Sequence, residues 1–196
     1  MKTITIDDVM KFHLCWEDAR ERMENIAAEY NRQDWTALDI LRLPKTLVNN
    51  VDKLWLVLRE DLIDAPILHE FACRCAERVL SRIDNPDPRS VAAMAAKRAW
   101  LKGEITNAQL KDASSNAHWA AEAAAKTADR AAYCAAEAAA YHAADTACRD
   151  AQISACRAAF EAANDADNNA CYADATAERA WQVETLIKIL EVNDQL

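Results

Sequence analysis

The chain has 196 residues, a formal net charge of −9, and only one glycine and four prolines. Glycine and proline, which interrupt helices, usually make up about 7% and 5% of a protein, so this composition favours helix along most of the chain. The negative charge argues against direct binding to nucleic-acid phosphates, and no apolar stretch resembles a signal peptide or a membrane span. We therefore expect an all-α cytoplasmic protein without nucleic-acid or membrane contacts, whose seven cysteines stay reduced and act mostly as small buried side chains.

The first helices are predicted from their start signals. Thr5 precedes two acidic residues and caps a short helix over residues 7–12. A second helix follows over residues 16–32, with apolar side chains three and four positions apart. Asp34 or Thr36 caps the next short helix. The tripeptide at 4–6 is the only strand-like fragment.

The middle of the chain predicts three longer helices. Asn50 is expected to cap a helix over residues 51–63, and Pro66 to open the next one. After a loop at residues 84–89, Asp87 followed by proline predicts a helix that runs to residue 102. Gly103 stands where a helix C-terminus favours a left-handed residue. Thr106 and Gln109 then match a capping box.

An alanine-rich tract covers roughly residues 113–180. A single helix over residues 107–163 would be about 85 Å long at about 1.5 Å per residue, too long for a compact domain. We expect a break at 114–116 or at 126–130, and another at 164–169, before a final helix over residues 171–191. Larger side chains at regular intervals predict a packed seam along the alanines: Trp119, Tyr133, Tyr141, Cys148, Cys156 and Phe160.

These elements predict a multi-helix bundle with an alanine-rich C-terminal half. We divide the chain into an N-terminal helical region, 1–105, and an alanine-rich region, 106–196, packed on it as one continuous domain. Small side chains allow neighbouring helices to approach closely.

Acidic residues are scattered through the alanine-rich half and outnumber the basic ones. They are either the solvated faces of amphipathic helices or a negative surface presented to a basic partner. The candidates for that surface are Glu122, Asp129, Glu137, Asp145, Asp150 and Glu161.

Cys73 and Cys75 lie two positions apart on a predicted helix and therefore point in different directions. His69 and Cys73 share a face, but no second pair completes a tetrahedral metal site. We expect one cysteine to face the core, and we expect neither a metal nor a cofactor.

Two histidines have a carboxylate one turn later, His118 with Glu122 and His142 with Asp145. Such a pair can orient a histidine for acid–base chemistry, but it more often stabilises a helix surface. No phosphate-binding glycine loop, nucleophile elbow or zinc-protease motif occurs. We predict that the protein is not an enzyme.

Asp87, Arg89, Arg98 and Trp100 form the most distinctive group of binding candidates. An arginine beside a helix N-terminus can hold a phosphate or a partner's carboxylate. The alternative is structural, with Arg89 or Arg98 bonded to Glu70 or Glu77 of the preceding helix. We favour the structural alternative and leave the other open.

The segment LHEFACRCAERVLSRIDNPDPRSVAAMAAKRAWLKGEIT, followed by AHWAAEAAA, resembles the immunity proteins of bacterial polymorphic-toxin systems. LDILRL and DKLWLVLREDLI upstream resemble phage-encoded versions. Two positions depart from the pattern: Arg74 stands where the family often has an acid, and His13-Leu14-Cys15 where phage versions often have Asn-Pro-Cys. The resemblance implies an all-helical protein that neutralises a toxin or an enzyme by binding it.

Three functional hypotheses follow. The first is a phage or bacterial protein that inhibits a toxin, or a host or defence enzyme, by protein–protein contact through an acidic surface. The second is a nucleotide or small-molecule binder, acting as a sponge or an enzyme, with a pocket near Arg89, Arg98, Trp100 and His118. The third is a structural module that forms homo-oligomers through its alanine seam.

Overall fold

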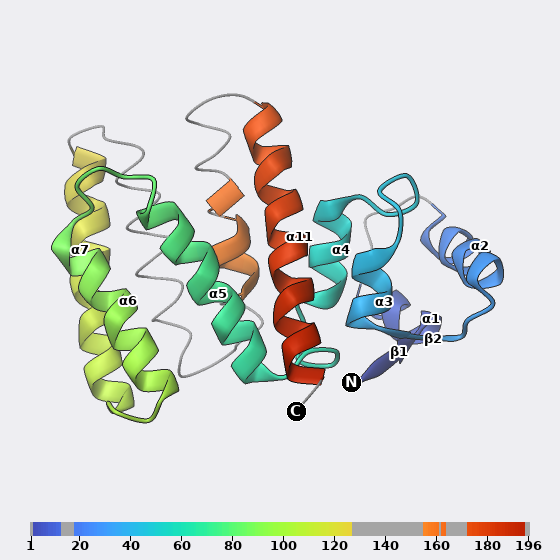
Figure 1. Cartoon of the computed structure of the whole chain (residues 1–196), viewed down its shortest axis with the longest axis horizontal. Coiled ribbons are helices and arrows are strands. Elements are labelled where there is room, and N and C mark those ends of the chain that lie inside the picture. Colours follow the sequence, from blue (N-terminus) through green and yellow to red (C-terminus); the bar gives the residue numbers. More distant parts are fainter. Residues whose placement is uncertain (1, 13–17, 127–154, 161, 164–171, 195–196) are drawn as a thin grey trace.

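The computed structural model of the chain is helical almost throughout (Figure 1). It describes residues 2–12, 18–126, 155–160, 162–163 and 172–194. The prediction of an all-α protein is confirmed, with one small two-stranded sheet in this part of the chain. No helix in these segments has the length and apolar character needed to cross a membrane.

The N-terminal segment contains two short strands that pair with each other and two helices that connect them. Strand β1 (Thr3–Thr5) runs antiparallel to β2 (Asp34–Thr36), with Ile4 opposite Trp35. Between them lie α1 (Ile6–Met10) and α2 (Ala19–Tyr30). The strand-like tripeptide of the sequence is thus part of a real strand, stabilised because Ile4 and Trp35 are both buried.

The same capping pattern starts two helices. Thr5 caps α1 and Thr36 caps α3 (Ala37–Arg42), and in each case an aspartate three residues later bonds back to the threonine. This reciprocal arrangement satisfies backbone N–H groups that a helix start leaves open. The predicted starts of both helices are confirmed.

Helix α4 (Asn50–Val57) differs from its prediction at both ends. Its cap is Asn49, whose Oδ1 accepts a hydrogen bond of 2.9 Å from the Asp52 backbone N–H, and not Asn50. The helix was predicted to reach residue 63 but ends at Val57, because Leu58 leaves helical geometry and the Arg59 N–H turns back to the Val57 carbonyl.

Lys53 of α4 caps the C-terminal end of α3 from inside the protein. It is 3% exposed, and its Nζ donates to the carbonyls of Leu41, at 3.1 Å, and of Leu43. A buried ammonium is tolerated here because it satisfies carbonyls that the end of α3 leaves without an intrahelical partner.

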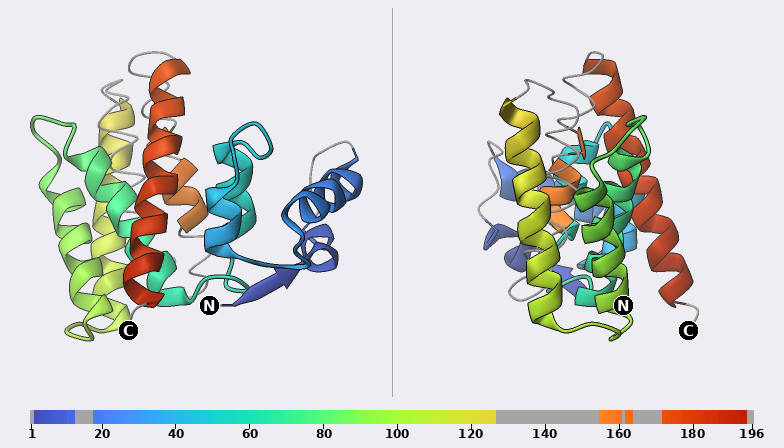
Figure 2. Two further views of the ribbon diagram at one scale, coloured as in Figure 1. Left: turned by 45° about the vertical axis from the view of Figure 1, so that its right-hand side comes forward. Right: turned by 90° about the vertical axis from the view of Figure 1, so that its left-hand side faces the viewer.

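Helices α5 (Ala65–Leu80), α6 (Pro88–Leu101) and α7 (Asn107–Lys126) follow in the order predicted. Gly103 has φ +74° and ends α6, as its position indicated. The capping box at Thr106 and Gln109 is present and starts α7. Helices α6 and α7 pack as an antiparallel pair at one end of the molecule (Figure 2).

Of the two alternatives for the first break, the one at residues 114–116 is excluded, since α7 continues through them. Ser115 stays in the helix because its hydroxyl donates to the Lys111 carbonyl one turn earlier, at 3.0 Å. Ala93 of α6 and Ala117 of α7 pack together and are fully buried, as expected of a small-residue contact. The breaks predicted at 126–130 and 164–169 fall largely or wholly outside the described residues.

Of the predicted seam of larger side chains, Cys156 packs on the main core as expected, but the two aromatic residues that the structure describes do not. Trp119 is 59% exposed and Phe160 is 51% exposed, because the alanines beside them make the helix contacts instead. Tyr133, Tyr141 and Cys148 lie outside the described residues.

Helix α11 (Tyr172–Asp194) lies at the centre of the molecule and packs on α3, α4 and α5 (Figure 1). The main core contains side chains from these helices together with Ala155, Ala158, Ala159 and Ala162. Elements from both predicted regions, 1–105 and 106–196, therefore share one core.

A buried ion cluster joins α11 to α5. The Glu178 side chain is 0% exposed, and its Oε2 accepts hydrogen bonds from Arg78 Nε, at 2.9 Å, and from Arg82 Nη2. Arg78 also stacks on Trp181, with its Cζ 4.3 Å from the ring centroid. The carboxylate can be buried there because two guanidinium groups compensate for the lost hydration.

Candidate functional site

Arg89 is bound to the cap of its own helix. The Asp87 carboxylate accepts from the backbone N–H of Arg89 at 2.8 Å, and from its Nε and Nη2 at 3.0 and 2.7 Å. The hydrogen bond from Arg89 lowers the pKa of Asp87. Asp87 thus occupies the helix N-terminus that could otherwise receive an external anion.

Arg98 joins α6 to α5. Its guanidinium donates two hydrogen bonds of 2.7 Å to the Glu77 carboxylate and a third to Glu70, which also accepts from Arg74 at 2.8 Å. The bonds to Glu77 raise the pKa of Arg98. Burial opposes the charged form of Glu70, but the bonds from Arg74 and Arg98 outweigh it and lower its pKa. Arg98 thus bonds to Glu70 and Glu77 of the preceding helix, as the structural alternative for this residue predicted.

Trp100 is part of a buried cluster that sequence reasoning missed. Its Nε1 donates to Asn107 Oδ1 at 2.7 Å, and its ring meets the His69 ring edge-on, with centroids 5.3 Å apart. Lys97, which is 0% exposed, lies 4.4 Å from the Trp100 ring and 3.3 Å from His69 Nδ1. Burial, and then the nearby Lys97 charge, lower the pKa of His69 to about 4. A neutral His69 can therefore accept a hydrogen bond from Lys97.

The sequence carried a weak signal for this cluster. His69 lies between Leu68 and Phe71 on the apolar face of α5, and Lys97 follows Ala93 by one helical turn. Nothing local showed that the two polar side chains would face each other across the α5–α6 contact.

The remaining candidates are separated. His118 lies on α7, with its Nε2 3.5 Å from Glu122, which is the surface pair anticipated for them. Arg89 and Arg98 are nine positions apart on α6, about 13.5 Å along the helix axis. Asp129, Glu137, Asp145, Asp150, Glu161 and His142 lie outside the described residues.

The prediction that one cysteine of the CRC segment faces the core is wrong, because Cys73 and Cys75 are both fully buried. Helices α6 and α11 both pack on α5, so side chains that point in different directions from α5 can both be buried. Burial raises the pKa of Cys73 to about 12 and raises that of Cys75 well above its usual value. Both thiols remain protonated and unreactive.

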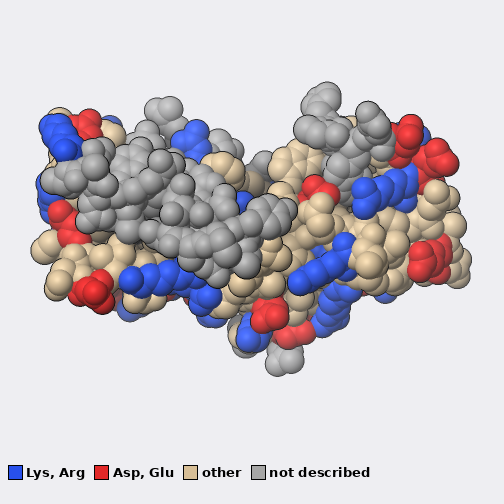
Figure 3. All heavy atoms as spheres, turned by 90° about the horizontal axis from the view of Figure 1, so that it is seen from above, with Lys and Arg blue, Asp and Glu red and all other residues tan. Residues whose placement is uncertain are grey.

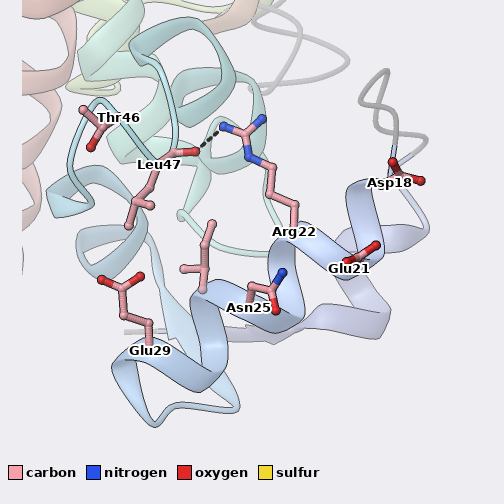
Figure 4. Close-up of a pocket in the computed structure, with 8 residues that line it drawn as sticks. Asp18, Glu21, Arg22, Asn25, Glu29, Thr46 and Leu47 are labelled. Atoms are coloured by element: carbon pink, nitrogen blue, oxygen red, sulfur yellow. Dashed lines mark hydrogen bonds between the residues drawn. The ribbon is translucent and has the colours of Figure 1, made fainter.

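An acidic groove lies beside α2 (Figure 4), at the opposite end of the molecule from α7 (Figure 1). It has a volume of about 400 Å³ and lies between α2 and the loop that contains Thr46 and Leu47. Arg22 spans it and donates to the Leu47 carbonyl. Three exposed carboxylates line it, from Asp18, Glu21 and Glu29.

The surface around this groove is locally acidic. Seen from above, Asp and Glu side chains lie at the α2 end of the molecule with Lys and Arg side chains between them, and further acidic side chains lie at the other end (Figure 3). Acidic residues and arginines are interspersed over positions 17–29, but the sequence alone does not predict that this segment lies beside residues 46 and 47.

A search of the curated proteins found no match to the chain, and a search of the solved structures found none either. A scan against protein-family models matched the family described as "Imm-5 like putative immunity protein" over residues 64–189. The match begins at α5, includes α6 and α7, and ends within α11. Because it covers more than half of the chain, the chain belongs to the Imm-5 like immunity protein family.

Proposed function

We propose that the protein neutralises a protein toxin by binding it directly, without catalysing a reaction. The family match over residues 64–189 is the observation that carries this proposal. For a phage-encoded protein of this family, the same mode of action would apply to a host or defence enzyme.

The acidic groove beside α2 supplies a surface for the contact. Its three carboxylates from Asp18, Glu21 and Glu29 are exposed, and its volume of about 400 Å³ admits a lysine or arginine side chain. Opposite charges on two partners accelerate their encounter and fix their orientation. A basic segment of the toxin is the ligand that this chemistry favours.

The nucleotide-binding alternative gains no support from the described residues. Arg89 and Arg98 already bind carboxylates of this chain. A phosphate would have to displace those carboxylates before it could reach either guanidinium.

Affinity capture from the cells that naturally contain the protein tests the proposal. We expect the tagged chain to retain one protein in a fixed stoichiometric ratio, and this protein to be toxic when it is expressed without its partner. Recovery of no stoichiometric protein, or of a non-toxic one, would contradict the proposal.

A charge-matched comparison tests the groove. The double variant Glu21→Gln/Glu29→Gln removes two groove carboxylates, whereas Glu104→Gln/Glu184→Gln removes two exposed carboxylates elsewhere. We expect the groove variant alone to slow association with the captured protein and to reduce its salt dependence. Equal effects of the two variants would exclude a specific role for the groove.

A further inference from the structure

Arg59 is held against two aromatic rings just beyond the end of α4. Its guanidinium Cζ lies 3.9 Å from the centroid of the Phe12 ring and 4.4 Å from that of the Trp55 ring. Both distances are within the range of cation–π attraction. The two rings restrict the guanidinium to one position.

No carboxylate of the described residues lies within ion-pair distance of this guanidinium, although the nearby Asp61 charge favours its charged form. Arg59 Nε is buried and has no hydrogen-bond partner, and burial lowers the pKa of the side chain. Other arginines of the same part of the chain do form ion pairs: Arg20, Arg32, Arg42, Arg74, Arg78, Arg82, Arg89 and Arg98.

We infer that Arg59, Trp55 and Phe12 form a binding site for a single carboxylate, the Asp or Glu side chain of the neutralised protein. A partly desolvated guanidinium that no described carboxylate pairs with gains more from a carboxylate than an exposed one does. Since the rings already restrict its motion, little conformational entropy is lost on binding. Trp55 is 38% exposed, and arginine beside tryptophan is the composition typical of interface hot spots.

The surroundings favour a carboxylate over a polyanion. The chain has a net charge of −9, which opposes a nucleic-acid backbone. Lys2, whose Nζ reaches the Glu60 carbonyl close to Arg59 in sequence, is already paired with Asp64 at 2.8 Å. One cation supported by two aromatic rings suits one carboxylate.

This site lies outside the part of the chain that the family model matches, since Phe12, Trp55 and Arg59 all precede residue 64. The inference rests on the proposed function for the identity of the protein that carries the carboxylate, but not for the binding of the carboxylate itself.

Side-chain NMR of the full chain, labelled with ¹⁵N arginine, measures this binding directly. Sodium acetate is titrated at constant ionic strength against sodium chloride, and Arg59→Lys assigns the Arg59 signal. Arg157 is the internal reference, because it is exposed and has no carboxylate partner among the described residues. We expect acetate to saturate Arg59 at a concentration about ten-fold lower than Arg157, because Arg59 is preorganised.

Trp55→Leu is expected to weaken acetate binding at Arg59 several-fold, whereas Trp119→Leu, at a distant exposed tryptophan, leaves it unchanged. Equal acetate affinities at Arg59 and Arg157 would overturn the inference, as would an unchanged affinity in Trp55→Leu. Tighter binding of inorganic phosphate than of acetate at Arg59 would overturn the choice of a carboxylate.

Affinity capture then separates this inference from the proposed function. We expect Arg59→Gln to lose the captured protein at least ten-fold faster than the wild type, while Arg157→Gln does not. Acetate binding without any captured protein would contradict the proposed function and leave the anion site standing. Equal capture by wild type and Arg59→Gln would refute the partner assignment alone.

Discussion

His69 should make the stability of the protein depend on pH between about 4 and 6.5. The residue is 7% exposed, its ring meets Trp100 edge-on, and its Nδ1 lies 3.3 Å from Lys97 Nζ. Burial and the Lys97 charge lower its folded-state pKa from 6.5 to about 4. The unfolded chain therefore binds the His69 proton more readily, and stability is lost as the pH falls from 6.5 towards 4.

The two pKa values set the size of the effect. Between pH 7.5 and pH 5 they predict a loss of about 2 kcal/mol in the free energy of unfolding from this group. Carboxylates with lowered folded-state pKa values, such as Asp87, change little in this range because their unfolded pKa is about 4.

Urea unfolding followed by circular dichroism at both pH values measures this difference. His69→Gln cannot titrate but can still accept a hydrogen bond from Lys97, so we expect it to lose about 2 kcal/mol less than the wild type between the two pH values. His118→Gln, at a half-exposed histidine, leaves His69 in place and should keep the loss that His69 causes. The explanation fails if His69→Gln loses as much stability on acidification as the wild type.

Three other substitutions test single features of the fold by urea unfolding at neutral pH. Lys53→Met leaves the last carbonyls of α3 without their buried donor and should cost about 1–3 kcal/mol, whereas Lys45→Met, at an exposed lysine, should cost almost nothing. Gly103→Ala should lower the free energy of unfolding by about 1–2 kcal/mol, because φ is +74°. No neighbouring atom would clash with the added methyl group, so only this backbone strain contributes, and Gly103→Asn should cost less. Glu178→Gln leaves two guanidinium groups without their carboxylate and should cost about 3 kcal/mol, and an unchanged stability would show that the pair contributes little.

The helix starts could be predicted because their causes are local. Thr5, Thr36, Asp87 and Thr106 each bond a backbone N–H within three residues, and Gly103 needs only its own freedom of φ. The same reasoning failed at α4, where two adjacent asparagines are both possible caps and Asn49, not Asn50, is the one that caps the helix.

The sequence identified the candidate binding residues, but not most of the side chains that they contact. Arg98 was recognised together with its structural alternative, yet Lys97 beside it was missed. A lysine that is 0% exposed and stacked on Trp100 contradicts the usual preference of lysine for the surface. Arg59 was missed for a similar reason, since its two rings come from positions 12 and 55.

The sequence by itself determined that the chain is helical and where most described helices begin, because these properties depend on composition and on neighbours within one turn. Tertiary structure alone decided that both Cys73 and Cys75 are buried, that His69 faces Lys97, and that the carboxylates beside α2 face the loop that contains Thr46 and Leu47. The physical reason is that burial and pairing depend on which helix faces are covered, and contacts between segments distant in the chain determine that.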